Sequence, residues 1–175
     1  MYALKPERAE DGTAIETLLD HAFGANRLER TVYQLRLGAP LAGLSLVARK
    51  RGSVVGSLRF WPVEIERGAD AVLLGPLAVE PSLRGQGIGK ALVAKGLVAA
   101  TKSGYGLCLV SGDPAYYRPF GFVAADPLGL SLPGPVTPGH FQVKELAPGW
   151  LALARGMVRP AAGRGQVAAR AEKAA

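Results

Sequence analysis

Three glycines, Gly85, Gly87 and Gly89, stand at every second position after Arg84 and lead into an apolar, helix-like stretch. Glycine has no Cβ, so the backbone N–H groups around it can come close to another molecule. The N-terminus of the following helix would add about half a positive charge. Because N–H groups that converge at such a junction bind phosphates, the segment predicts a phosphate-binding loop.

Two common nucleotide-binding motifs do not fit this loop. The dinucleotide fingerprint G-x-G-x-x-G requires a third glycine at position 90 or 92, where the chain has Lys90 and Leu92. A Walker P-loop around Gly89 requires glycine at position 84 and Ser or Thr at position 91, where the chain has Arg84 and Ala91. The pattern that remains is R-x-x-G-x-G. The alternative to a phosphate-binding loop is a tight solvent-exposed turn.

The net charge of +7 is concentrated in the second half of the 175-residue chain. Residues 1–80 carry ten Lys or Arg and ten Asp or Glu, whereas residues 81–175 carry eleven and four. This asymmetry favours an anionic partner, either nucleic acid or a phosphorylated small molecule. Nucleic acid is the weaker candidate, because the basic residues are scattered and lack interleaved aromatic residues. A solvated basic surface with a basic tail is the alternative that involves no partner.

The rest of the composition argues against several classes of protein. With 49% hydrophobic and 20% charged residues, the chain has the composition of a single globular domain. No uncharged apolar run approaches the roughly 20 residues of a membrane span, and the first residues contain no apolar signal-peptide core. One cysteine, Cys108, and two histidines, His21 and His140, predict no disulfide framework and no zinc site. We expect a cytoplasmic protein with Cys108 in its core.

The first half of the chain predicts alternating short strands and helices. Residues 2–6 form a strand, and Asp11 caps the N-terminus of a helix whose apolar residues recur at helical spacing. A second helix is predicted for residues 28–37. The segment 44–60 is typical of a β-hairpin, and residues 60–66 prolong its second strand.

The strand predicted at 72–79 carries Gly75 and Pro76 in its middle. Proline cannot donate a ladder hydrogen bond, so we expect this strand to be irregular or to separate from a neighbour there. Asp113 is expected to cap a short helix. The other elements predicted downstream are a buried helix over 87–103, a buried strand over 107–112, a helical turn within 113–122 and a strand over 141–146.

Two of these segments resemble motifs of one enzyme family. LAVEPSLRGQGIGKAL, residues 77–92, resembles the acyl-CoA-binding segment L-x-V-x-P-x-x-R-G-x-G-I-G of the GNAT superfamily of N-acetyltransferases. DPAYYRPFGF, residues 113–122, resembles the later stretch of that superfamily that ends in Y-x-x-x-G-F. One helix and one strand separate the two motifs, as in the superfamily. Further similarity, for example in TVYQLR at 31–36, is to its YhbS-type branch and extends over about residues 2–160.

The resemblance implies an α/β (α+β) protein with the GNAT fold. Residues 1–160 would form one domain around a central mixed, twisted sheet of six to seven strands. This sheet would be splayed between its fourth and fifth strands and would carry helices on both faces. Residues 161–175 would form a basic, low-complexity C-terminal tail.

The activity implied is that of an acetyl-CoA-dependent N-acetyltransferase. Such an enzyme moves the acetyl group from the CoA thioester to a primary amine by direct attack within a ternary complex. Acetyl-CoA would be the co-substrate, no metal would be needed, and the acceptor would be a small-molecule or peptide amine. The resemblance also raises the prospect of a homodimer. An acyl-CoA-binding sensor or partner module with weak catalysis is the alternative function for the same fold.

Site residues carry over from the resemblance position by position. The main chain of residues 77–79 would bind the pantetheine arm, and residues 84–90 would cradle the pyrophosphate. Tyr117 matches the tyrosine of Y-x-x-x-G-F and would be the general acid that protonates the departing thiolate, with Tyr116 as the competing neighbour. A backbone N–H near Val79 would stabilise the oxyanion. The implied binding residues are Leu77, Ala78, Val79, Arg84, Gly85, Gln86, Gly87, Ile88, Gly89 and Lys90.

One acid that the resemblance leads us to expect is missing. Many members of the superfamily have a Glu on the strand before L-x-V that deprotonates the amine, whereas this chain has Gly75 and Pro76 there. An ordinary amine is mostly protonated at neutral pH, so a proton acceptor or relay is expected unless the substrate amine has a low pKa. The candidates for this relay are Glu29, Ser57, Glu64 and Ser111.

Overall fold

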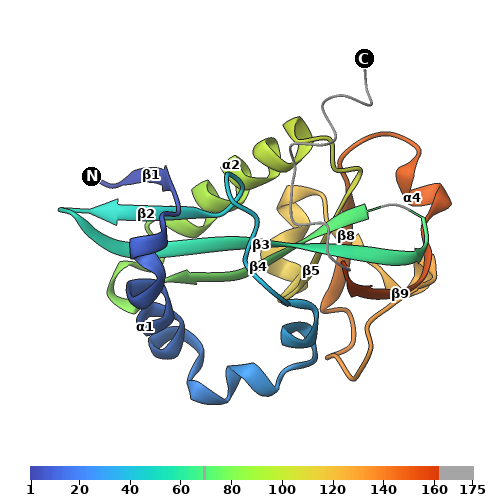
Figure 1. Ribbon diagram of the computed structural model, residues 1–175, viewed down its shortest axis with the longest axis horizontal. Helices are drawn as coiled ribbons and strands as arrows, with labels where there is room; N and C mark the ends of the chain where they lie inside the picture. Colours follow the sequence, from blue (N-terminus) through green and yellow to red (C-terminus); the bar gives the residue numbers. More distant parts are fainter. Residues whose placement is uncertain (69, 162–175) are drawn as a thin grey trace.

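The computed structural model of the protein describes residues 1–68 and 70–161 (Figure 1). The strands are β1 (Ala3–Pro6), β2 (Leu46–Lys50), β3 (Ser53–Arg67), β4 (Asp70–Val79), β5 (Leu107–Ser111), β6 (Val123–Ala124), β7 (Leu130–Ser131), β8 (Phe141–Glu145) and β9 (Arg155–Pro160). The α-helices are α1 (Gly12–Phe23), α2 (Ile88–Lys102), α3 (Pro114–Tyr117) and α4 (Trp150–Leu153). Short 3-10 helices are η1 (Ala9–Asp11), η2 (Ala25–Glu29), η3 (Thr31–Leu35), η4 (Pro81–Leu83), η5 (Arg118–Phe120) and η6 (Asp126–Leu128).

One mixed sheet runs through the middle of the molecule. Its strands follow one another in the order β1-β2-β3-β4-β5-β8-β6. All neighbours along this path are antiparallel except β4 and β5, which are parallel and are connected through α2. β9 pairs with the C-terminal part of β3, and β7 pairs with β9. The predicted mixed sheet is therefore confirmed, but it has nine strands rather than six to seven, because β9 and β7 extend it beside β3.

The sheet opens between β4 and β5 halfway along β4. Residues 71–74 of β4 pair with residues 107–110 of β5, and beyond Leu74 β4 keeps only its partner β3. The opening begins at a bulge in β4. Leu74 lies opposite Phe60, and Leu77 lies opposite Leu58. Two residues of β4, Gly75 and Pro76, therefore face the single residue Arg59 of β3. The irregularity and the splay that this glycine–proline pair predicts are both confirmed.

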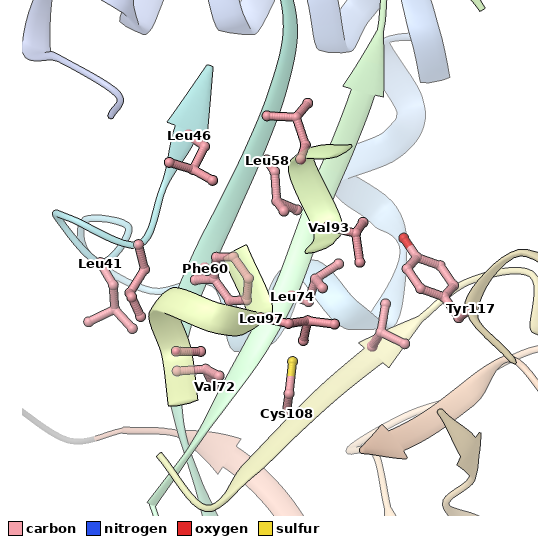
Figure 2. Packing of buried hydrophobic residues seen from close by; sticks show 14 of the residues in the cluster. Leu41, Leu46, Leu58, Phe60, Val72, Leu74, Val93, Leu97, Cys108 and Tyr117 are labelled. Carbon is pink, nitrogen blue, oxygen red and sulfur yellow. The ribbon is translucent and has the colours of Figure 1, made fainter. Parts of the chain in front are cut away.

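The two long helices cover opposite faces of the sheet (Figure 1). On the face under α2, buried residues of the helix and the strands form one apolar cluster, part of which is shown in Figure 2. Val72 and Leu74 of β4 belong to this cluster, whereas Ala71 and Leu73 belong to a cluster on the other face. Successive strand residues point to opposite faces, so residues 71–74 of β4 are all apolar because both faces are covered there.

The helix predicted for residues 28–37 is wrong. Two 3-10 helices, η2 and η3, occupy this region, and Arg30 between them has an extended backbone with φ −69° and ψ 140°. Val32 and Leu35 are buried three residues apart, which suits a 3-10 helix with three residues per turn. The Thr31 hydroxyl donates a hydrogen bond to the Pro135 carbonyl at 2.6 Å. A contact with a segment about a hundred residues away thus holds the chain in a shape that its local pattern does not predict.

The predicted capping role of Asp11 is also wrong, although α1 does begin at the next residue. The Asp11 side chain caps no helical N–H group. It is 3% exposed, accepts a hydrogen bond from the Arg8 backbone N–H at 2.9 Å and forms an ion pair with Arg49 of β2. Asp11 therefore ties the start of α1 to the sheet.

β9 ends at Pro160, close to the end of the residues that the structure describes. The predicted basic tail comprises residues 161–175. All of it except residue 161 lies outside the described residues. Among the helices of the described part, none combines the length and the apolar character that crossing a membrane requires.

Candidate functional site

The glycine-rich loop joins η4 to α2. Gly85 and Gly87 have φ of +79° and +80°, a left-handed conformation that side chains other than glycine rarely adopt. No atom lies within 4 Å of the place where a Cβ would stand at either residue, so the loop is open on that side. At Gly89 a Cβ would stand 2.6 Å from the Tyr116 hydroxyl oxygen. The loop therefore leaves room for a ligand, and Tyr116 lies beside it.

The backbone of this loop offers free hydrogen-bond donors. Within the described part of the chain, the backbone N–H groups of residues 85–90 donate no hydrogen bond. The first N–H group at the start of α2 that does so belongs to Ala91, which donates to the Gly87 carbonyl at 3.0 Å. These donors lie at the positive end of a 15-residue helix. Such an arrangement fits a pyrophosphate, which accepts hydrogen bonds and carries negative charge.

A cleft of about 520 Å³, here called the glycine cleft, runs from this loop along β4. All the implied binding residues except Gln86 line it, together with Phe23 of α1 and Tyr116 of α3. Residues 77–79 of β4 form part of its wall, at the point where β4 has no pairing with β5. The structure thus brings the two halves of the implied CoA site into one continuous hollow.

A second cleft of about 570 Å³, here called the splay cleft, opens where β4 and β5 separate. Its walls come from residues 74–76 of β4, the end of β5, Tyr117, the segment 29–36 and the loop 135–140. Phe23 lines both clefts. The two clefts therefore meet along β4, on either side of the opening in the sheet.

The two candidate tyrosines face different clefts. Tyr117 is 7% exposed and lines the splay cleft, whereas Tyr116 lines the glycine cleft. Their rings meet edge to face with centroids 5.0 Å apart. α3 carries both of them, and Asp113 caps this helix as predicted by accepting a hydrogen bond from the Ala115 N–H at 2.9 Å.

Tyr117 stands at the margin of the apolar cluster, with its hydroxyl directed toward Val93 (Figure 2). Burial raises the pKa of Tyr117 well above its ordinary value, and the nearby guanidinium of Arg36 offsets part of this rise. The Tyr117 hydroxyl therefore keeps its proton at neutral pH, as a proton donor must. Burial also raises the pKa of Tyr116.

Of the four candidates for the proton relay, Glu29 and Ser111 line the splay cleft. Neither Ser57, which is fully buried in the sheet, nor Glu64, which lies opposite Asp70, lines either cleft. The structure thus reduces the candidates to two.

His140 is a third group in the splay cleft that could accept a proton, and the sequence did not point to it. Its carbonyl accepts hydrogen bonds from the Gly112 N–H at 3.0 Å and from Gln142 Nε2 at 3.4 Å. These bonds depend on the pairing of β8 with β5, and no local pattern announces that pairing.

Arg36 is the other side chain in the splay cleft that the sequence left without a role. Its guanidinium carbon lies 4.2 Å from the centre of the Tyr33 ring. Its Nη2 atom would stand 3.0 Å from a Cβ at Gly75, so the guanidinium lies directly over the start of the splay. The signal in the sequence was the i, i+3 spacing of Tyr33 and Arg36 within TVYQLR, which a short 3-10 helix places on one face.

The remaining candidate groups have other places in the molecule. Cys108 is fully buried in the cluster under α2, as predicted, and burial raises the pKa of its thiol. A larger hollow of about 780 Å³ lies between β1, β2 and α1, but its lining includes no implied site residue. In the part of the chain that the structure describes, no three His, Cys, Asp or Glu residues are grouped in a way that could hold a metal ion.

Comparison with known proteins finds the same family that the motifs resemble. Residues 42–124 match the profile of the acetyltransferase (GNAT) domain. The uncharacterized N-acetyltransferase YhbS of Escherichia coli is 38% identical over 140 residues, which are 78% of this chain and 83% of that protein. The crystal structure of Escherichia coli YhbS in complex with CoA covers 91% of this chain and 89% of its own, with a TM-score of 0.79 and 35% identity. A Brucella melitensis GNAT acetyltransferase in complex with acetyl-CoA covers 93% and 97%, with a TM-score of 0.68 and 30% identity.

Proposed function

The chain belongs to the GNAT family of N-acetyltransferases, and we propose that it transfers the acetyl group of acetyl-CoA to an amine by direct attack in a ternary complex. The observation that carries this proposal is the meeting of two clefts at the splayed half of β4. One cleft offers free backbone donors, and the other offers side chains that can give and take protons. This division suits a reaction with one large anionic substrate and one small acceptor.

The glycine cleft is proposed to bind CoA. The N–H groups of residues 85–90 would hold the pyrophosphate, and Arg84 and Lys90, both exposed beside the loop, would add positive charge. The open edge of β4 at residues 77–79 would form main-chain hydrogen bonds with the pantetheine arm, as an added strand does. Two relatives with the same fold were crystallised with CoA or acetyl-CoA, which supports this assignment. Acetyl-CoA would supply an activated acetyl group.

The splay cleft is proposed to bind the amine and to move its protons. Tyr117 would donate the proton that the departing thiolate needs, because its hydroxyl keeps its proton and the residue lines the splay cleft. A carboxylate or an imidazole is the usual acceptor for a proton that leaves an amine. Glu29 and His140 would therefore share this role, directly or through water, with Ser111 as a relay.

The first test of this function is a titration of the protein with acetyl-CoA by calorimetry. We expect one site per chain, with affinity that falls as salt increases, since charges on the phosphates contribute to binding. A second experiment measures release of free CoA in the presence of a panel of amines. Amine-dependent release identifies the enzyme. Tight binding of acetyl-CoA with no release above the hydrolysis background would favour the sensor or partner module of the same fold.

A further inference from the structure

Three arginines have guanidinium groups that are largely removed from water, and two of them have acidic partners. Arg27 is 4% exposed and pairs with Glu16 at 2.7 Å and with Asp20. Arg59 is 9% exposed and pairs with Glu7 and Glu16, each at 2.8 Å.

The third, Arg36, has no such partner. Its Nε and Nη1 atoms are buried, and neither donates a hydrogen bond to any residue that the structure describes. No acidic residue of the described part forms an ion pair with it. Burial lowers the pKa of Arg36 to about 10, so the group is still charged at neutral pH. A buried charge with unmet donors is costly, and proteins that keep one usually provide an anion for it.

The position of Arg36 indicates where that anion comes from. The guanidinium is stacked on Tyr33 and lies over Gly75, which has φ +115° and no side chain to displace it. Both contacts hold it at the start of the splay, in the wall of the cleft proposed for the acceptor amine. Nη2 is not among the buried atoms of Arg36, so an anionic group on the acceptor would pair with the guanidinium there and supply the counter-charge that the protein itself does not provide.

We propose that Arg36 binds a carboxylate of the acceptor, so that the substrates are amino acids or other small amines that carry a carboxylate near the reacting nitrogen. This inference rests on the proposed acetyltransferase function. A planar guanidinium matches a carboxylate well and forms charge-assisted hydrogen bonds with it. Glu29, an exposed carboxylate in the same cleft, provides the opposite charge for the ammonium form of the amine. The cleft thus offers both charges that a zwitterionic amino acid requires.

A different role for the same side chain must be separated from this one. Arg36 lies close enough to Tyr117 to influence its pKa, so it could stabilise negative charge that develops on the tyrosine or the thiolate. In that role Arg36 would accelerate the reaction of every amine alike. In the proposed role it favours only those amines that carry a carboxylate.

The test compares each of several L-amino acids with its own amide, at saturating acetyl-CoA, by the rate of CoA release. Each pair has the same side chain, and the amide lacks only the α-carboxylate. Intrinsic reactivity favours the amide, because its amine loses a proton more readily. The amides of Asp and Glu keep a side-chain carboxylate and so distinguish that source of the anion from the α-carboxylate. The proteins compared are the wild type, Arg36→Met, Arg36→Lys and, as a control, Arg118→Met, which removes an exposed charge that lines neither cleft.

We expect the wild type to prefer carboxylate-bearing amines by about tenfold or more in kcat/KM. Arg36→Met should lose about tenfold or more on these amines, mainly through KM, and less than about threefold on the plain amides. Arg36→Lys should restore part of the preference, and Arg118→Met should resemble the wild type. Affinity for acetyl-CoA should be the same in all four proteins.

Equal losses on acids and amides in Arg36→Met would overturn the inference in favour of a role in the chemical step. A wild type that acetylates the plain amides but no carboxylate-bearing amine, or that shows no preference for carboxylate-bearing amines, would overturn it as well. Failure of the proposed function itself has a different signature, because the wild type would then either bind no acetyl-CoA in calorimetry or bind it and release no CoA with any amine, acid or amide.

Discussion

The glycine cleft and the splay cleft lie side by side along β4, but they are built from different parts of the polypeptide. The glycine cleft is lined mainly by one continuous stretch, residues 77–90, which offers free backbone N–H groups. The splay cleft is lined by five separate segments, which are Phe23 and residues 29–36, 74–76, 110–117 and 135–140, and its groups that can give or take protons are side chains. A backbone site serves a ligand part that is the same in every reaction, whereas a side-chain site can change with the acceptor. This difference between the two clefts supports the proposal that the first binds the cofactor and the second selects the acceptor.

The largest effect is expected at the junction of the two clefts. Tyr117→Phe should lower kcat by about 10²- to 10⁴-fold, which is the usual contribution of a general acid. Affinity for acetyl-CoA should change little, because Tyr117 does not line the glycine cleft. Steady-state rates of CoA release, together with calorimetry, measure the two quantities.

Tyr116→Phe is the matched control for this substitution. Its hydroxyl lies beside Gly89 in the glycine cleft, so its loss should reduce the affinity for acetyl-CoA modestly and kcat far less. A large fall in kcat at Tyr116 alone would exchange the roles of the two tyrosines, and small equal losses would make Tyr117 a packing residue.

The next largest effect is expected on acetyl-CoA affinity, after a substitution in the glycine-rich loop. Gly87→Val should weaken acetyl-CoA binding by more than about tenfold, because a branched side chain would keep the pyrophosphate away from the N–H groups. Gly104→Val has the same cost in backbone strain, since Gly104 has φ +84° and also has no atom within 4 Å of its Cβ position. Gly104 follows the other end of α2, outside the glycine cleft.

Both valine variants should therefore lose about 1–2 kcal/mol of stability, and only Gly87→Val should lose affinity. Thermal unfolding and calorimetry on the pair separate the two effects. Unchanged affinity in a folded Gly87→Val protein would show that the glycine cleft is not the CoA site.

A smaller effect contrasts the paired arginines with the unpaired one. Glu16 bridges Arg27 and Arg59 and is itself about half exposed at 53%. Glu16→Ala should lower the free energy of unfolding by about 1 kcal/mol, because each arginine keeps one other carboxylate but loses the bridge. Urea unfolding at pH 8 measures this change, and an unchanged midpoint would mean that the bridge contributes nothing.

Arg36→Met should change stability in the opposite direction, raising the free energy of unfolding by about 1 kcal/mol at pH 8. The folded pKa of about 10 lies below the ordinary value of 12.5, so the folded protein holds this proton less tightly than the unfolded chain. The wild type should therefore gain stability as pH rises above about 10, and its difference from Arg36→Met should shrink there. Urea unfolding at pH 8 and at pH 10.5, which is about 0.5 pH units above that pKa, tests both statements. A destabilised Arg36→Met protein at pH 8 would mean that stacking on Tyr33 outweighs the buried charge.

The contrast between the clefts also explains what could be predicted from the sequence. The open glycine-rich loop could be predicted from its own residues, and the other residues that line the glycine cleft were implied by the family resemblance, because the glycines, the strand and the helix are neighbours in the chain. The opening of the sheet was predicted for the same reason, since Gly75 and Pro76 break the ladder where they stand. In each case the physical constraint acts within a few residues.

The splay cleft could not be predicted in this way. Residues 28–37 have a helical pattern, but the bond from Thr31 to the Pro135 carbonyl and the burial of Val32 and Leu35 favour two 3-10 helices instead. His140 reaches the cleft only after β8 pairs with β5. Asp11 was misassigned for a similar reason, because its partner Arg49 comes from a distant strand. Contacts between residues far apart in the sequence determine all three features, and a single sequence does not reveal such contacts.

The burial of Cys108 has a practical consequence for spectroscopy and assays. It is the single cysteine of the chain, and its sulfur is sealed in the apolar cluster under α2 with a thiol that resists ionisation. Disulfide-exchange dyes react with thiolates that they can reach, so the native protein should give no signal with them. Free CoA could then be followed continuously without a protein blank. Two introduced cysteines, one on α1 and one in the glycine-rich loop, would then be the only accessible attachment points for a pair of labels, and the distance between these two elements could be measured in solution.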